Sequence, residues 1–131
     1  MSRVLAIDPG EARLGLAISD PTRTIARPLR VLQHETRNRD AARIVAIATQ
    51  EDADLIVIGI AYAEDGEIGH QARRAIRLKE ALALAGAPTI ETWDESGSTQ
   101  AALALGPEDS LVDARAAAIL LQEYLDAHRP A

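Results

Sequence analysis

Residues 4–20, VLAIDPGEARLGLAISD, hold two apolar runs on either side of a short turn. The first run is followed by an acid, Asp8, and then by a Pro-Gly pair. The second run starts after Arg13. Continuous apolar runs bounded by turn residues are typical of buried strands, and so short a connection favours an antiparallel hairpin. The stretch therefore predicts a buried hairpin with an acid at the end of its first strand.

The patterns that follow alternate between strand and helix. An alternating run at 28–33 predicts a third strand with one exposed face, and the β-branched run at 54–60 predicts a central parallel strand. A helix is predicted over 39–51 from the spacing of its apolar residues, Ala42, Ile44, Val45 and Ala48.

The second half of the chain continues this alternation. Its patterns predict a helix at about 68–85 with Gly86 as C-cap, a strand at 88–93, a short helix before Gly106-Pro107, and a last helix from Ser110 to about Ala127. We therefore expect an α/β fold, a five-stranded mixed sheet flanked by helices. Three antiparallel N-terminal strands are extended by two parallel ones, in a single domain over residues 1–131.

Composition narrows the class of protein. The chain has no Cys, which excludes disulfides and thiolate metal ligands, and no apolar stretch near the twenty residues of a membrane span. A cytoplasmic protein with no membrane partner is the expectation. The net charge is −6, yet Arg residues gather between Arg23 and Arg43. That cluster either meets nucleic-acid phosphates or forms an ordinary solvated face.

Carboxylates stand where the predicted strands and helices end. Asp8 ends the first strand, Asp94 and Glu95 follow the last strand, and Asp113 lies in the first turn of the last helix. Ligand sites form outside the carboxyl ends of parallel strands. Hard oxygen ligands without Cys suit Mg²⁺ or Mn²⁺, and two such ions activate water against a phosphodiester.

Each acid also has a purely structural interpretation. Asp8 is compatible with a turn residue that bonds its own backbone, and Ser110-x-x-Asp113 with a capping box. Asp94 and Glu95 are compatible with solvated loop acids. The three His residues lie in unrelated settings that favour the surface, although His70 is placed to reach a substrate from the loop at 61–70.

Five segments, in order, resemble the YqgF/RuvX family. They are DPGEARLGLAISD, ARPL, DLIVIGIAYAEDGEIGHQA, WDESGST and VDARAAAILLQEYL, and they span most of the chain. The sequence departs from the family pattern where Ala12 replaces a Lys and Ser96 replaces an Arg. Each lost cation weakens the electrostatic binding of a polyanion such as a nucleic acid.

The resemblance implies an RNase H-like fold related to Holliday-junction resolvases. It implies a nuclease that processes the precursor of small-subunit 16S ribosomal RNA, with cleavage of branched DNA also proposed. The implied catalytic and metal-binding acids are Asp8, Glu95 and Asp113, with Asp94 in reserve and two Mg²⁺ or Mn²⁺ ions as cofactors. Arg13 and the Ser98-Thr99 pair match positions that would contact the substrate, and a two-fold symmetric junction would favour a homodimer.

Two other classes of function remain open from the sequence. One is a binding module for nucleic acid or ribosome assembly that keeps the acids for structure, favoured by Ser96 and the acidic surface. The other is a phosphotransferase of the actin-like or sugar-kinase-like kind, which would need two such domains to clasp a nucleotide. A Rossmann cofactor site is weaker still, since no Gly-x-Gly-x-x-Gly follows a strand.

Overall fold

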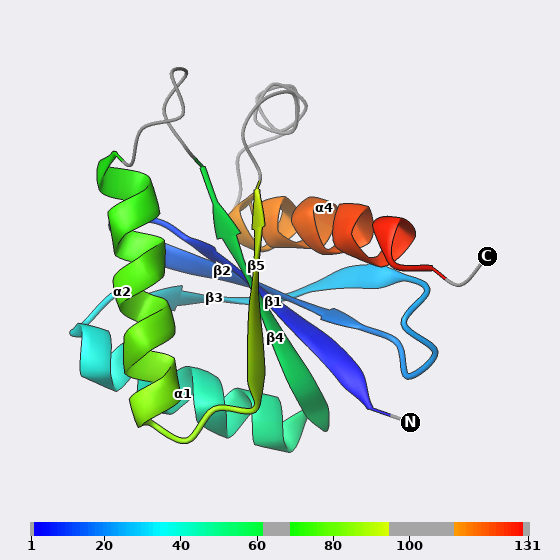
Figure 1. The fold of residues 1–131 in the computed structure, drawn as a ribbon, viewed down its shortest axis with the longest axis horizontal. Coiled ribbons are helices and arrows are strands. Elements are labelled where there is room, and N and C mark those ends of the chain that lie inside the picture. The colour runs from blue at the N-terminus through cyan, green and yellow to red at the C-terminus, as the bar shows by residue number, and fades with distance from the viewer. Residues whose placement is uncertain (1, 62–68, 95–111, 130–131) are drawn as a thin grey trace.

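The computed structural model describes residues 2–61, 69–94 and 112–129, and these contain five strands and three helices (Figure 1). In chain order they are β1 (Arg3–Pro9), β2 (Arg13–Ser19), β3 (Ala26–Gln33), α1 (Arg37–Gln50), β4 (Ala53–Ile60), α2 (His70–Leu84), β5 (Thr89–Asp94) and α4 (Val112–Ala127). The predicted short helix before Gly106-Pro107 and the Ser110 cap lie outside the described residues.

The strands form one mixed sheet in the order β3-β2-β1-β4-β5. The predicted hairpin is confirmed: β1 and β2 are antiparallel, with Asp8 opposite Gly15. On its other side β1 runs parallel to β4, where Ile7 is level with Ile58, and β5 is parallel to β4 in turn. The carboxyl ends of β1, β4 and β5 therefore lie along the same edge of the sheet.

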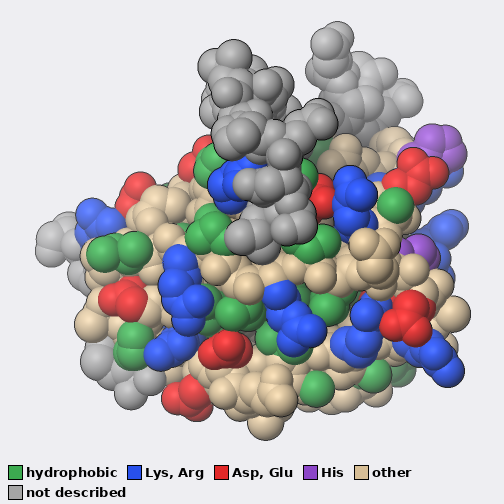
Figure 2. All heavy atoms as spheres, turned by 180° about the vertical axis from the view of Figure 1, so that it is seen from behind, with side chains coloured by type: hydrophobic (Ala, Val, Ile, Leu, Met, Phe, Trp, Pro, Cys, Tyr) green, Lys and Arg blue, Asp and Glu red, His purple; other side chains and the backbone are tan. Residues whose placement is uncertain are grey.

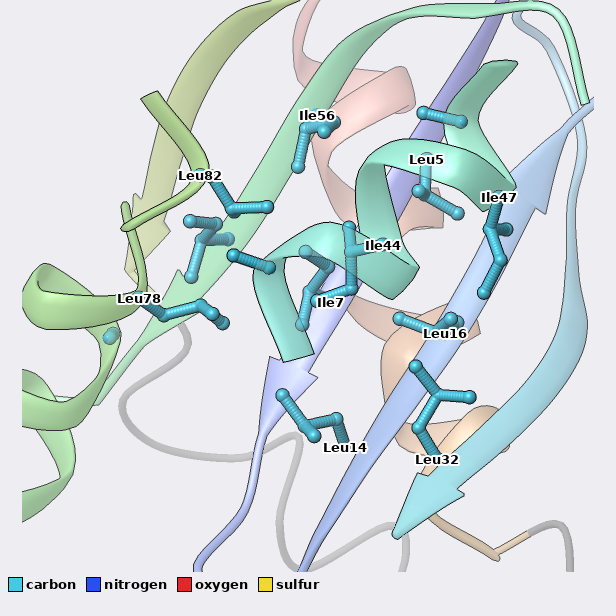
Figure 3. Packing of buried hydrophobic residues seen from close by; sticks show 14 of the residues in the cluster. Leu5, Ile7, Leu14, Leu16, Leu32, Ile44, Ile47, Ile56, Leu78 and Leu82 are labelled. Atoms are coloured by element: carbon cyan, nitrogen blue, oxygen red, sulfur yellow. The ribbon is translucent and has the colours of Figure 1, made fainter. Parts of the chain in front are cut away.

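Helices cover both faces of this sheet (Figure 1). Alternate residues of a strand point to opposite faces. Thus Leu5 and Ile7 of β1 pack with α1 and α2, whereas Val4 and Ala6 pack with α4. Figure 3 shows the larger cluster, in which side chains of the sheet meet those of α1 and α2. The buried run of β4 contributes to both clusters, as predicted for a central strand.

The two helices on the first face start and end close to the predicted positions. Thr36 caps α1, since its hydroxyl accepts a hydrogen bond from the Arg39 amide at 3.1 Å. Ala42, one of the apolar residues whose spacing predicts this helix, is exposed, because the buried stripe of α1 runs through Ala41 instead. α2 is followed by Gly86 with φ of +88°, which only glycine adopts without strain.

The third helix, α4, lies across the antiparallel half of the sheet. The Gln122 side chain accepts from the Ala26 amide at 2.9 Å and donates to the Thr24 carbonyl oxygen at 2.9 Å. These two hydrogen bonds fix α4 to the start of β3. None of the described helices is both long and apolar enough to cross a membrane.

Candidate functional site

Asp8 stands near the carboxyl end of β1 and is half-buried. Its neighbour Ile7 belongs to the core beneath α1 and α2. By the alternation of the strand, Asp8 shares the opposite face with Val4 and Ala6, which is the face that α4 covers. The rigid centre of the sheet therefore presents this carboxylate toward the N-terminal end of α4.

Asp113 reaches the same place from the other end of the sequence. It lies in the first turn of α4, and the backbone of that turn touches Gly15 of β2. A Cβ atom on Gly15 would stand only 1.9 Å from the Asp113 carbonyl oxygen. Because Gly15 is also the residue opposite Asp8, the close approach brings the backbones that carry Asp8 and Asp113 to the same glycine.

Arg13, the first residue of β2, lies beside Asp113. Its Nε donates a hydrogen bond of 2.8 Å to Oδ2 of Asp113, and the pair is partly exposed. The sequence predicts Arg13 as a phosphate contact, but does not predict its bond to Asp113. A guanidinium has five N–H donors, so this bond orients the group and leaves other donors for a phosphate.

The other predicted residues divide into two groups. Asp94 is exposed at the end of β5, along the same edge of the sheet but beyond β4. Glu95, Ser98 and Thr99 lie outside the described residues. Within the part of the chain that the structure describes, no group of three or more acids or His residues lies close enough to hold a metal ion.

The donors that are described fit a hard divalent cation in their chemistry. Asp8 and Asp113 supply carboxylate oxygens, the ligands that Mg²⁺ and Mn²⁺ prefer. Both are partly accessible to solvent, so an ion bound there would retain water ligands. These two carboxylates alone are an incomplete ligand set for such an ion.

A second group of polar residues, which the sequence interpretation missed, lies on the other face of the sheet. Asp40 of α1 is only 2% exposed, and its carboxylate bonds the His34 ring, the Glu35 amide and Arg43. Burial by itself raises the pKa of Asp40, but these hydrogen bonds outweigh it and hold the pKa below its ordinary value.

The sequence does contain a signal for this group. Asp40 stands four residues before Ile44 and seven before Ile47, so it lies on the buried stripe of α1. An acid on a buried stripe needs partners, and the candidates are the polar residues just before the helix. His34 is exposed, as the sequence predicts, and the structure adds that its ring is paired with Asp40.

His70 also lies on this second face. It is exposed at the start of α2 and lines a cavity with Pro9 and His34. The structure thus separates His70 from Asp8 and Asp113: the three residues share one edge of the sheet but not one face. The predicted contact of His70 with a substrate stays a prediction.

The fold places the chain in a known structural class. It matches RuvC of T. thermophilus, solved in complex with a Holliday junction substrate, with a TM-score of 0.62 and 20% identity over 97% of this chain and 95% of that one. It also matches the Fowlpox virus resolvase, with a TM-score of 0.57 and 10% identity over 98% and 99% of the two chains. The fold is therefore RNase H-like, of the RuvC kind, as the sequence predicts.

Closer sequence relatives identify the family. A protein of Anaeromyxobacter sp. (strain Fw109-5), named "Putative pre-16S rRNA nuclease", is 39% identical, covering 95% of this chain and 96% of the relative. A protein of the same name from Chloroflexus aurantiacus is 36% identical over 96% of this chain and 88% of its own. The model of the RuvX family, described as Holliday junction resolvase, matches residues 2–127. The chain belongs to the RuvX family and is a nuclease.

Proposed function

We propose that this protein is a divalent-metal-dependent endonuclease that cuts phosphodiester bonds in structured RNA, in particular the precursor of 16S ribosomal RNA. The observation that carries the proposal is the convergence of Asp8 and Asp113 on Gly15, at the carboxyl edge of the sheet. Two acids from opposite ends of the sequence meet where the fold presents a ligand site.

In this proposal Asp8, Glu95 and Asp113 are the catalytic acids and hold two Mg²⁺ or Mn²⁺ ions, with Asp94 as a further ligand. The ions, when bound, supply an activated water and stabilise the leaving oxygen of the phosphodiester. The chain's own part is to fix the carboxylates: β1 holds Asp8 in the sheet centre, and Arg13 orients Asp113 through its 2.8 Å bond. A rigid ligand set leaves less motion to be lost when the substrate binds.

The substrate is recognised through its phosphates. Arg13 retains donors beyond its bond to Asp113, and Ser98, Thr99 and His70 are the further contacts that we propose. The choice of RNA rests on the names of the relatives at 36–39% identity. Branched DNA is the second candidate substrate, because the RuvC neighbour was solved with a Holliday junction; a homodimer would match its two-fold symmetry. We propose a cytoplasmic location for this activity.

The test compares Asp8→Asn with a matched control, Asp52→Asn. Asp52 is exposed just before β4, at the opposite end of the strands, and its positive φ of 58° is one that Asn tolerates. Labelled precursor RNA and a four-way DNA junction are incubated with Mn²⁺, Mg²⁺ or EDTA. We expect cutting of the RNA that EDTA abolishes, a loss of at least about a hundredfold in Asp8→Asn, and little change in Asp52→Asn.

A second function would account for one feature of the site. The Arg13–Asp113 ion pair already satisfies one acid without a metal, as expected of a binding module that keeps its acids for structure. Such a module would bind RNA equally well with Mn²⁺ or EDTA, and Asp8→Asn would leave that binding unchanged. Binding without cutting in the same experiment would decide in its favour.

A further inference from the structure

A cavity of about 480 Å³ lies beside the β1–β2 turn, on the face of the sheet that α1 and α2 cover. Part of its lining is apolar, with Pro9 from β1, Leu14 from β2 and Leu78 from α2. Asp8 and Asp113 lie on the opposite face and do not line it. Its volume falls within the range of roughly 300–1,000 Å³ that is usual for small-molecule sites.

Four arginines line the same cavity. Arg37 comes from the first residue of α1, and Arg73, Arg74 and Arg77 come from the first two turns of α2. The side chains of these four make no hydrogen bond or ion pair with any residue that the structure describes. Figure 2 shows His side chains at one edge of the molecule, beside Lys or Arg and also beside acidic side chains.

Two acids also line the cavity, fewer than its arginines. The Asp40 carboxylate already bonds His34 and Arg43. Glu11 lies on the exposed β1–β2 turn. Four guanidinium groups against one acid on the exposed turn leave an excess of positive charge around the cavity, and this excess favours an anion as its ligand.

The start of α2 adds a second, independent attraction for an anion. Its N-cap is Gly69, which has no side chain to cap the helix, and its first turn contains no acid. His70 and Arg73 stand there instead, although the positive end of a helix dipole disfavours cations. Backbone N–H groups and basic side chains at one helix start form the usual setting for a phosphate.

His34 gives the cavity one further polar group whose orientation is fixed. Its Nδ1 bonds Oδ2 of the buried Asp40, so the ring is held by a carboxylate. The other ring nitrogen, Nε2, is then left for a ligand in the cavity that His34 lines.

We propose that this cavity binds a nucleoside phosphate. The phosphate lies among Arg37, Arg73 and Arg77 at the start of α2, and the nucleoside packs against the apolar wall that Leu14 and Leu78 provide. This inference goes beyond the proposed nuclease function and does not rest on it, since the cavity uses neither the catalytic acids nor a metal. The nucleotide is either free in solution or one unit of an RNA strand.

The experiment measures binding of adenosine 5′-monophosphate by calorimetry, in EDTA, to the wild-type protein and to two variants on α2. Arg77→Glu removes a cation of the cavity, and Lys79→Glu makes the same change of charge at an exposed residue of α2 that does not line it. We expect binding that weakens at least about tenfold in Arg77→Glu and less than about twofold in Lys79→Glu. Arg73→Gln, a milder change, should also weaken it, and circular dichroism confirms that each variant is folded.

Two further probes distinguish the source of the nucleotide. If a short 5′-phosphorylated RNA binds more tightly than adenosine monophosphate and is displaced by it, the ligand is a unit of a strand. If the monophosphate binds as tightly as the RNA, the ligand is a free nucleotide. Both results support the cavity as a nucleoside phosphate site.

Other outcomes would overturn the proposal. These are no binding of adenosine monophosphate at millimolar concentration, equal weakening by Arg77→Glu and Lys79→Glu, or equal affinity for adenosine or inorganic phosphate alone. Asp8→Asn should bind adenosine monophosphate as the wild type does. Failure of the nuclease proposal, seen as no cutting, is therefore distinct from failure of this one, seen as no binding.

Discussion

Gly15 is the residue on which the geometry of the candidate site depends most. It lies opposite Asp8 in the hairpin, and the first turn of α4 packs against its backbone. Any side chain at this position would overlap the Asp113 carbonyl oxygen, since even a Cβ atom would be 1.9 Å away. Close backbone approach is one of the few roles that only glycine fills.

Gly15→Ala should therefore destabilise the protein and separate the two acids. Backbone atoms have to move to admit the methyl group, so we expect a loss of about 2 kcal/mol or more in the free energy of unfolding, measured in urea. Metal-dependent cutting should fall with it.

The control for this substitution is Gly69→Ser. A Cβ atom on Gly69 meets nothing within 4 Å in the described part of the chain, and Ser is a favoured N-cap. We expect its stability to stay within about 0.5 kcal/mol of the wild type. Equal losses in the two variants would contradict the role given to Gly15.

For single residues, the sequence predicts the positions of the candidate acids. It does not predict the hydrogen bonds that orient their side chains. Asp8 at the end of an apolar run and Asp113 at a helix start are both visible as patterns. The Arg13–Asp113 bond is not, because it joins residues 100 positions apart and depends on how α4 packs on β2. Pairing across such a distance is set by tertiary structure, which local patterns do not contain.

The connection from β3 to α1 is held by a buried acid. Asp40 bonds His34 and the Glu35 amide on the incoming segment and Arg43 on its own helix. The Thr36 hydroxyl caps the same helix. A buried carboxylate with this many donors is stabilising only while it is ionised, so the connection should respond to acid.

Asp40→Asn should lower stability in a way that depends on pH. The folded-state pKa of Asp40 is held below its ordinary value of 3.8, so its charge stabilises the fold above that value. This stabilisation is lost as the pH falls through the folded-state pKa. We expect Asp40→Asn to cost about 1–3 kcal/mol at pH 7, a cost that shrinks below about pH 4. Urea unfolding at several pH values measures the difference, and a constant difference would contradict the prediction.

The type and order of the helices and strands are the features of the structure that the sequence predicts best. All five strands and all three helices that the structure describes were predicted in the right order, because long apolar periodicities mark them. The sequence does not tell which of Ala41 and Ala42 is buried, because the two are equally small and apolar. Only the direction of α1 over the sheet decides which of the two is buried.

The whole molecule is built as two cores that share one sheet. Ile44 of α1 belongs to the core on one face, and Leu120 of α4 belongs to the core on the other. β1 and β4 contribute side chains to both. Since the loss of either core removes support from the same two strands, we expect the faces to unfold together.

Ile44→Ala and Leu120→Ala should each cost about 2–5 kcal/mol, as is usual when a large buried side chain is truncated. In both variants the unfolding curves from far-ultraviolet circular dichroism and from the fluorescence of Trp93, the single tryptophan, should coincide. Trp93 reports on the α4 face, because its ring is 5.6 Å from that of Tyr124. A fluorescence transition that precedes the loss of helix in Leu120→Ala would show that the faces unfold separately.

The contact between Arg13 and Asp113 has a consequence for the time at which activity appears during synthesis. The hairpin leaves the ribosome early, but its partner helix emerges only after a hundred more residues. A growing chain therefore carries Asp8 without Asp113 and has no complete pair of acids. A nuclease that needs both acids is therefore inactive until α4 has been synthesised and has packed against the hairpin.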